Sequence, residues 1–347
     1  MARGLSASLF ALILLCPATA HSAAASSPEA FYSGKTINLL IGFAPGGDND
    51  SWARTIARYW ASHIPGRPRL VPQNAPGAGS LRLMNQLYNT YPKDGLYIGL
   101  ISRGIPFEPL LGGDGTQFDA SRMNWIGSPD RDTNICVARK DSAVKTMRDL
   151  FTKELLVGAT GSGADTAIYP EFLSSLLGMK FKLVNGYQGT NEISLALERK
   201  EVEGVCVAHD SIMRDTIGRS GQLNILFQAT LVADARLPNV PLATDLARSE
   251  NDRQALELFF ARVAIGRPFA VPPGVPADRV EALRKSFDDT MKDPAFLADT
   301  RRQGFNVDAI QGREIAERIA AAYRTPKDVV ARTIVALGRP VPNALSK

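Results

Sequence analysis

Short apolar runs alternate along this chain with stretches in which apolar residues recur at helical spacing. The first run, residues 36–43, is almost wholly apolar, which is typical of a strand buried on both faces of a sheet. A helix is expected from about Asp50, because Trp52, Ile56 and Trp60 fall on one stripe. A stripe of this kind indicates core packing rather than a ligand platform.

Two further strands are expected at residues 69–72 and 96–101. The helix between them carries Leu83, Met84 and Leu87 on one face, with Ser80 as its expected N-cap. Three strands alternating with two helices predict a parallel sheet with right-handed crossovers.

The pattern then restarts, with strands expected at residues 134–138, 155–159, 180–184, 202–207 and 223–227. The chain is expected to return to the first sheet near residues 260–265 and to be mostly helical afterwards. The fold class is therefore α/β, with two open, mostly parallel sheets in two lobes. Residues 35–132 with 259–347 form the first lobe and residues 133–258 the second, so that two chain crossings make a hinge.

The N-terminus is typical of a secretory signal peptide over residues 1–24. Arg3 precedes an apolar run at residues 9–15, and small residues follow up to Ala20 and Ala24. The run is too short to span a bilayer. A lipoprotein signal is disfavoured because Leu15, before Cys16, is not small. We therefore expect export to the periplasm.

Composition narrows the classes of function that the protein could have. The 347 residues carry a formal charge of +5, spread without a basic block, so no nucleic-acid partner is expected. Three histidines leave little for a metal site, and no cofactor or metal is expected. His209, Asp210 and Ser211 are triad residue types, but adjacent residues do not make a triad, and no G-x-S-x-G elbow exists. We do not expect an enzyme.

Two cysteines remain after the signal peptide, Cys136 and Cys206, each inside an apolar run. In an oxidising compartment they could form a disulfide. They could equally be two buried thiols on separate strands.

Two glycine-rich loops each follow a strand and open a helix. One contains Pro45, Gly46 and Gly47, and the other runs from Thr160 to Gly163. Glycines let the backbone approach a ligand closely, and the first N–H groups of a helix attract carboxylate or phosphate. Either loop alone is typical of an ordinary turn, but two that face one cleft would form an anion site.

Several segments in register resemble one family, the substrate-binding receptors of tripartite tricarboxylate transporters, also called the Bordetella uptake gene family. They are residues 41–47 with Asp50, residues 74–79, 92–95, 186–189, 237–241 and 271–276. Their order and spacing hold from about Lys35 to Tyr323.

The resemblance implies a periplasmic-binding-protein fold of type II, the Venus flytrap. It also implies a small organic acid or amino-acid-like ligand, membrane transporter subunits as partners, and a monomer. The ligand-binding positions that it implies are Pro45, Gly46, Gly47, Asp48, Ala75, Pro76, Ser102, Arg103, Thr160, Gly161, Ser162, Gly163, Asp165, Tyr187 and Asp210. Two alternatives stay open: a ligand sensor for a membrane signalling protein, and a secreted α/β enzyme.

One departure from the family pattern bears on the ligand. The family continues its first loop with glycine, whereas this chain has Asp48, Asn49 and Asp50. Asp48 would compete with a ligand carboxylate and could favour a ligand that carries a cationic group. Arg103 could offset it by pairing with a carboxylate. Alternatively, Asp48 and Asp50 only cap the helix and Arg103 points to solvent.

Overall fold

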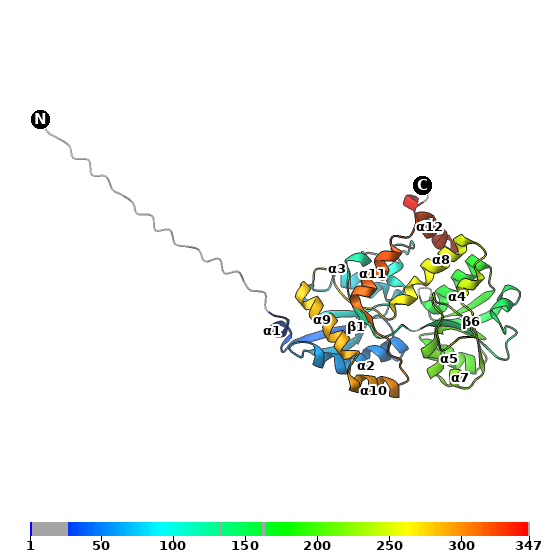
Figure 1. Cartoon of the computed structure of the whole chain (residues 1–347), viewed down its shortest axis with the longest axis horizontal. Helices are drawn as coiled ribbons and strands as arrows, with labels where there is room; N and C mark the ends of the chain where they lie inside the picture. Colours follow the sequence, from blue (N-terminus) through cyan, green and yellow to red (C-terminus); the bar gives the residue numbers. More distant parts are fainter. Residues whose placement is uncertain (2–26, 132, 162–163, 346–347) are drawn as a thin grey trace.

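The computed structural model describes Met1 and residues 27–131, 133–161 and 164–345. The predicted signal peptide beyond Met1, and the predicted site residues Ser162 and Gly163, lie outside the described residues. Two α/β lobes lie side by side (Figure 1). The described part of the chain contains no helix that is both long enough and apolar enough to cross a membrane.

The first lobe is built on a six-stranded sheet with the order β11-β4-β10-β3-β1-β2. Its strands are β1 (Thr36–Ile41), β2 (Arg69–Asn74), β3 (Tyr97–Leu100), β4 (Asn124–Ser128), β10 (Phe269–Val271) and β11 (Ile310–Gln311). β1 is parallel to β2 and β3, as predicted, and β10 runs antiparallel to β3 and β4. β11 is antiparallel to β4, so most strands of the sheet share one direction.

Helices cover both faces of this sheet, and alternating strand residues explain why. Leu39 and Ile41 belong to the core beneath α2, whereas Leu40 belongs to the core on the opposite face. Trp52 and Trp60 of α2 are buried, as predicted. The helices of this lobe are α1 (Pro28–Tyr32), α2 (Asp48–His63), α3 (Leu81–Asn89), α9 (Ala277–Thr290), α10 (Pro294–Arg302) and α11 (Gly312–Ala322).

Ser80 was predicted to cap α3 through its side chain, and this prediction is wrong. Ser80 stands at the N-cap position, but its side chain makes no cap hydrogen bond. It is buried, and its Oγ accepts a hydrogen bond from the Ser102 backbone N–H at 2.8 Å. Ser80 therefore fixes the end of β3 rather than the start of the helix.

The second lobe is built on a five-stranded sheet with the order β7-β6-β8-β5-β9. Its elements are β5 (Asn134–Arg139), β6 (Leu155–Ala159), β7 (Phe181–Asn185), β8 (Gly204–Ala208) and β9 (Leu223–Gln228), with helices α4 (Asp165–Leu177), α5 (Thr190–Glu198), α6 (His209–Arg214) and α7 (Thr216–Arg219). β5 runs against the other four strands, because it pairs antiparallel with β8 and β9 while β6 pairs parallel with β7 and β8. The predicted α/β class with mostly parallel sheets is confirmed.

Two segments connect the lobes, one after β4 and one before β10. They touch each other: the Arg267 backbone N–H donates to Ser128 Oγ at 2.8 Å, and Ser128 Oγ donates to the Asp130 carbonyl at 2.9 Å. Gly266 has φ +59°, and a Cβ there would overlap the Asp130 carbonyl oxygen. Glycine is therefore required where the two crossings meet.

Two helices lie along the junction at the upper edge of the molecule, α8 (Glu250–Phe260) and α12 (Lys327–Ala336) (Figure 1). They pack on each other, and α12 also contacts α4. Phe259 of α8 belongs to the second-lobe core, whereas Val330 of α12 belongs to a first-lobe core. The exact lobe boundaries remain a prediction, since these helices contribute to both cores.

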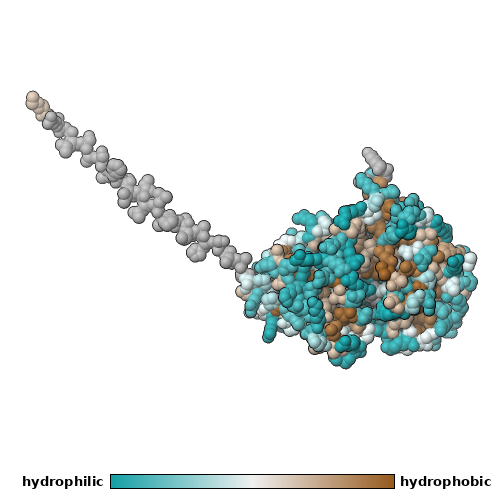
Figure 2. Space-filling view, in the orientation of Figure 1, coloured by the Kyte–Doolittle hydropathy of each residue, from teal (hydrophilic) through white to brown (hydrophobic). Residues whose placement is uncertain are grey.

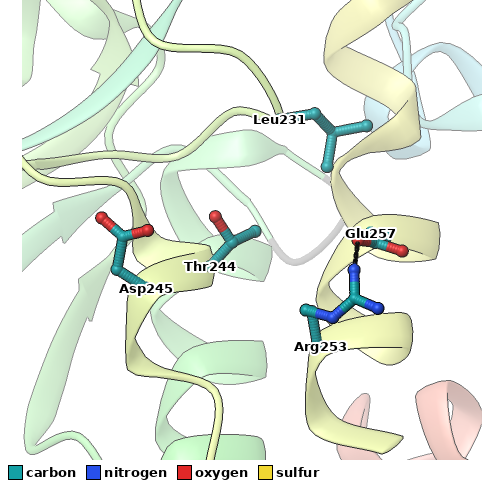
Figure 3. A pocket seen from close by; sticks show the side chains of 5 residues that line it. All are labelled: Leu231, Thr244, Asp245, Arg253 and Glu257. Atoms are coloured by element: carbon teal, nitrogen blue, oxygen red, sulfur yellow. Dashed lines mark hydrogen bonds and ion pairs between the residues drawn. The ribbon is translucent and has the colours of Figure 1, made fainter. Parts of the chain in front are cut away.

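Two hollows of the surface adjoin α8. The face in Figure 2 is mainly hydrophilic, and its hydrophobic residues lie in small groups. One hollow lies between α8 and the short 3-10 helix Ala243–Leu246, where Arg253 and Glu257 face Thr244 and Asp245 below Leu231 (Figure 3). A second adjoins α8 and α12. Neither is lined by residues of the predicted loops.

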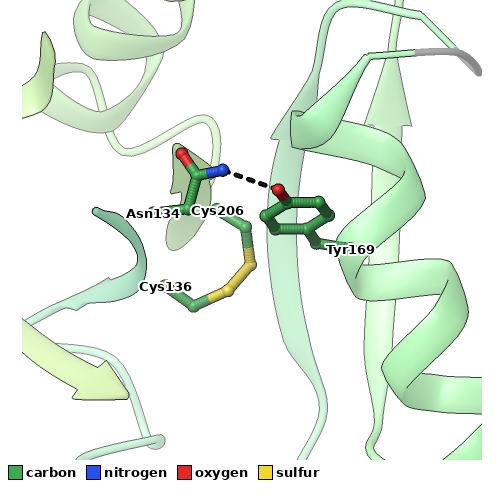
Figure 4. The surroundings of a disulfide bond; sticks show 4 residues. All are labelled: Asn134, Cys136, Tyr169 and Cys206. Atoms are coloured by element: carbon green, nitrogen blue, oxygen red, sulfur yellow. Dashed lines mark hydrogen bonds between the residues drawn. A yellow bond between two sulfur atoms is a disulfide. The ribbon is translucent and has the colours of Figure 1, made fainter. Parts of the chain in front are cut away.

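Cys136 and Cys206 form a disulfide, which answers the question that their sequence positions left open. They are register partners in β5 and β8, and both are fully buried. Asn134, two residues before Cys136, donates from its amide to the Tyr169 hydroxyl beside the disulfide (Figure 4). The bond thus joins two neighbouring strands of the second-lobe sheet.

Candidate functional site

The first glycine-rich loop is shaped by its own glycines and by Asp50. α2 begins at Asp48, two residues earlier than expected, with Gly47 at the N-cap. Gly46 has φ +83°, a conformation that favours glycine, and its N–H donates to Asp50 Oδ2 at 2.9 Å. Asp50 therefore supports the turn before the helix, and the alternative that it caps the helix is wrong, because α2 has no side-chain cap hydrogen bond.

The charge of Asp50 is held in place by three donors. Arg54 Nε lies 2.9 Å from its carboxylate, and the Asn74 amide donates to it at 2.8 Å. Burial acts to raise the pKa of Asp50, but hydrogen bonds from Arg54, Gly46 and Asn74 outweigh it and lower the pKa below the usual value. The loop after β1 is therefore tied to the end of β2.

Open space adjoins the glycines of both loops. Among the described residues, a Cβ at Gly46 or Gly161 would meet no atom within 4 Å, and one at Gly47 would meet only the Ala44 carbonyl oxygen at 3.9 Å. In the second loop, the Thr160 backbone N–H donates to Thr166 Oγ1 at 3.0 Å. The backbones of both loops are thus held by hydrogen bonds. At none of these three glycines would a Cβ collide with a described atom of the protein.

Asp48 does not cap α2; it lies between arginines of the two lobes. Its carboxylate pairs with Arg267, in the second crossing segment, and with Arg214, at the end of α6 in the second lobe. Arg267 also pairs with Asp130 of the first crossing segment. Arg267 and Asp130 are almost completely buried, so this chain of charges is shielded from water.

Arg103 does not point to solvent. It follows β3, is buried, and its Nε lies 3.6 Å from Asp165 Oδ2 at the start of α4. The same Asp165 oxygen accepts a hydrogen bond from the Asn134 amide at 3.1 Å. The carboxylate that Arg103 contacts in this structure is therefore one of the protein's own, contributed by the opposite lobe.

The two loops consequently face one junction. Asp48 directly follows the first loop and reaches Arg214, while Asp165 closely follows the second loop and reaches Arg103. In addition, the Asn191 amide of α5 donates to the Gly46 carbonyl at 3.0 Å. These contacts cross between the lobes, as the predicted shared site requires.

We call the six charged side chains at this junction the junction network: Asp48, Arg103, Asp130, Asp165, Arg214 and Arg267. Burial lowers the pKa of Arg214 to about 10, with the nearby Asp215 acting in the opposite direction. Burial also lowers the pKa of Arg267 well below its usual value, and the positive charge of Arg103 adds to this effect. The network therefore holds closely spaced charges that are poorly solvated.

For the other predicted site residues, the contacts in the structure lie within their own lobes. The side chain of Tyr187 packs on the second-lobe core, and burial raises its pKa. Asp210 pairs with Arg236 at 2.6 Å and with His209 at 2.9 Å, both within the second lobe. Ser102 is fixed by Ser80, and Ala75 packs against a first-lobe core. Pro45 and Pro76 are exposed.

Four residues of the junction escape sequence reasoning: Asp130, Asn134, Arg214 and Arg267. The signal for Asp130 and Arg267 was their position at the two expected lobe crossings. Nothing in the sequence pairs Arg214 with Asp48, because that contact joins residues far apart in the chain. Among the described residues no cluster of metal-ligating side chains occurs.

Residues 53–333 match the model of the family described as "Tripartite tricarboxylate transporter family receptor". A UPF0065 protein of Bordetella pertussis is 25% identical over 304 residues, which cover 85% of this chain and 88% of that protein.

Two solved structures from Rhodopseudomonas palustris share the fold. MatC with bound malate has a TM-score of 0.65 at 18% identity, covering 85% of this chain and 99% of that chain. Rpa4515 with adipate has a TM-score of 0.65 at 17% identity, covering 87% of this chain and 97% of that chain. The two-lobed periplasmic-binding-protein fold expected from the sequence is thereby confirmed.

Proposed function

Because this chain belongs to the tripartite tricarboxylate transporter receptor family, we propose that it captures a small carboxylate between its lobes and presents it to the membrane subunits of a tripartite transporter. The members of this family are solute-binding receptors, and the fold is that of substrate-binding receptors. The proposal adds the ligand class and the transporter partner to this assignment. It also places the mature protein in the periplasm, after removal of residues 1–24.

A single observation carries the proposal: two glycine-rich loops, one from each lobe, flank one junction that contains buried arginines. Backbone N–H groups at the starts of α2 and α4 attract a carboxylate, and guanidinium groups bind carboxylates bidentately. The space beside Gly46, Gly47 and Gly161 lets a ligand approach these backbones. The bound malate and adipate in the R. palustris structures support a carboxylate ligand.

Closure of the lobes gives the mechanism of capture. A ligand that contacts both loops binds the closed form better than the open form, and so it shifts the population toward closure. The residues proposed to contact it are those predicted from the family pattern, above all Gly47, Gly161 and Arg103. Closure would also form the surface that a membrane partner recognises.

The test is a melting-temperature screen of the mature protein against a broad panel of carboxylates, amino acids and amines. A ligand that binds only the folded state adds about 2.7 kcal/mol of stability at a hundredfold excess over its dissociation constant. Mass spectrometry of compounds that co-purify from the periplasm identifies candidates independently. If no member of the panel raises the melting temperature, the proposed function loses its support.

A further inference from the structure

The junction network is balanced in charge. It contains three arginines and three aspartates, and each arginine already contacts a carboxylate of the protein. Asp48 is central, because it contacts one arginine from each side of the junction, Arg214 and Arg267. A ligand carboxylate that approached these two guanidinium groups would therefore compete with Asp48 for them.

Adding net charge to such a site is costly. Poorly solvated charges need a nearby partner, and an uncompensated charge in a buried site is strongly unfavourable. A dicarboxylate without a cationic group brings two negative charges into a network whose cations are already paired. The same carbon skeleton with an ammonium group has a smaller net negative charge, because the ammonium group neutralises one of its two carboxylates.

Several buried polar atoms of the junction have no hydrogen-bond partner among the described residues. They include four acceptors, namely Asp48 Oδ1, Asp130 Oδ1, Asn134 Oδ1 and Asp165 Oδ1, and also donors, Arg214 Nη1 among them. Asn134 is fully buried, and its amide nitrogen contacts Asp165, so their two acceptors belong to one place in the site. An ammonium group supplies three donors for such acceptors, while a carboxylate oxygen suits Arg214 Nη1.

We propose that Asp48 sets the charge of the preferred ligand: by occupying Arg214 and Arg267, it makes the site favour a carboxylate that also carries an ammonium group over the same skeleton without one. This inference rests on the proposed function and adds a residue that determines specificity within it. Asp48 thus supplies, from the protein itself, a carboxylate that already pairs with two arginines of the site.

The experiment compares matched probes that differ only in the amino group. Dissociation constants of the mature protein are measured by calorimetry for aspartate and succinate, and for glutamate and glutarate. The readout is the ratio within each pair, because an effect on lobe closure that both probes share cancels in the ratio. We expect the wild-type protein to bind the amino member of the better-fitting pair about tenfold or more tightly, as expected for one uncompensated charge in a poorly solvated site.

Substitutions test whether Asp48 causes this preference. Asp48→Asn releases charge on Arg214 and Arg267, so the ratio should fall about tenfold toward the plain dicarboxylate. The double variant Asp48→Asn with Arg214→Gln restores the charge balance and should return the ratio toward the wild-type value. Asp165→Asn removes a negative charge from the opposite lobe and should also lower the ratio, which provides a second route if Asp48→Asn folds poorly.

The matched control is Asp299→Asn. Asp299 lies on α10 and pairs with Arg58 at 2.6 Å, outside the junction network, so the same loss of charge there should leave the ratio unchanged. Equal or tighter binding of succinate and glutarate by the wild-type protein, or an unchanged ratio in both aspartate variants, overturns the inference while the proposed function stands. Absence of binding by every carboxylate in the broad panel instead overturns the proposed function itself.

Discussion

Cys136 and Cys206 are direct partners across β5 and β8, with their Cα atoms 4.0 Å apart and a sequence separation of 70 residues. Their bond closes a long loop that contains most of the second lobe. Replacing both with alanine should lower the free energy of unfolding by about 4 kcal/mol, because the unfolded chain regains the entropy of that loop. Urea denaturation followed by circular dichroism measures the change.

The control for the disulfide uses the reductant. Reduction should destabilise the wild-type protein by a similar amount and leave the double alanine variant unaffected. Equal denaturation midpoints for the oxidised wild-type protein and the variant would contradict a stabilising role for the bond.

A second prediction concerns the close approach of the two crossing segments. Gly266→Ala should destabilise the protein by about 2–4 kcal/mol, since alanine would have to adopt a positive φ near +59° and its Cβ would overlap the Asp130 carbonyl oxygen. Gly338→Ala is the matched control: Gly338 has φ +68° with no atom within 4 Å of a Cβ, so it should cost only about 1 kcal/mol. Thermal unfolding of both variants checks the difference. Similar losses in the two would mean that the contact with Asp130 contributes nothing.

A third prediction tests the loop of the second lobe. Gly161→Leu should leave the free energy of unfolding within about 0.5 kcal/mol of wild type, because a side chain there meets open space. It should nevertheless weaken carboxylate binding more than tenfold, since that space is proposed to hold the ligand. Gly161→Ala, with a smaller side chain at the same position, should weaken binding less. Calorimetry with the best ligand of the panel provides the measurement, and unchanged affinity in Gly161→Leu would remove this loop from the site.

The sequence was sufficient to predict the elements that depend on local pattern. Buried strands such as β1 and β6 were predictable because each is a short, continuous apolar run, and the helix α2 was predictable because its apolar residues recur about every 3.6 positions. The return to the first sheet was predictable from the apolar segment before β10. The cap role of Ser80 was predicted incorrectly, because a buried contact with Ser102 competes with the helix end for its hydroxyl.

The site was predictable only as far as its loops. Glycines after buried strands mark the positions of both loops, and a family motif marks the first loop again. The ion pair between Asp48 and Arg214 joins residues of different lobes, and no local pattern encodes such a contact. The sequence likewise left Arg103 with two alternatives, which only the position of Asp165 decides.

The last prediction concerns acid stability and the ion pair between Arg131 and Glu314. Arg131 follows the first crossing, and its guanidinium contacts both carboxylate oxygens of Glu314 in α11, at 2.8 and 3.1 Å. This hydrogen bonding is the main cause that lowers the pKa of Glu314 to about 2, with a further contribution from Arg318 and with burial acting in the opposite direction. A carboxylate with a lowered pKa in the folded state stabilises the protein above its unfolded pKa, and this stabilisation is lost as the pH falls through the folded value.

The relevant window therefore runs from about pH 4.5 down to about pH 2. Because a third of the Glu314 side chain is exposed, solvent screening reduces the contribution to about 1–2 kcal/mol. Glu314→Gln should remove this part of the acid dependence, and Arg131→Gln should reduce it while leaving the carboxylate in place. Urea denaturation midpoints of the three proteins at pH 7, 4 and 3 measure the effect. A wild-type protein that loses no more stability than Glu314→Gln between pH 7 and 3 would show that this pair does not contribute to acid stability.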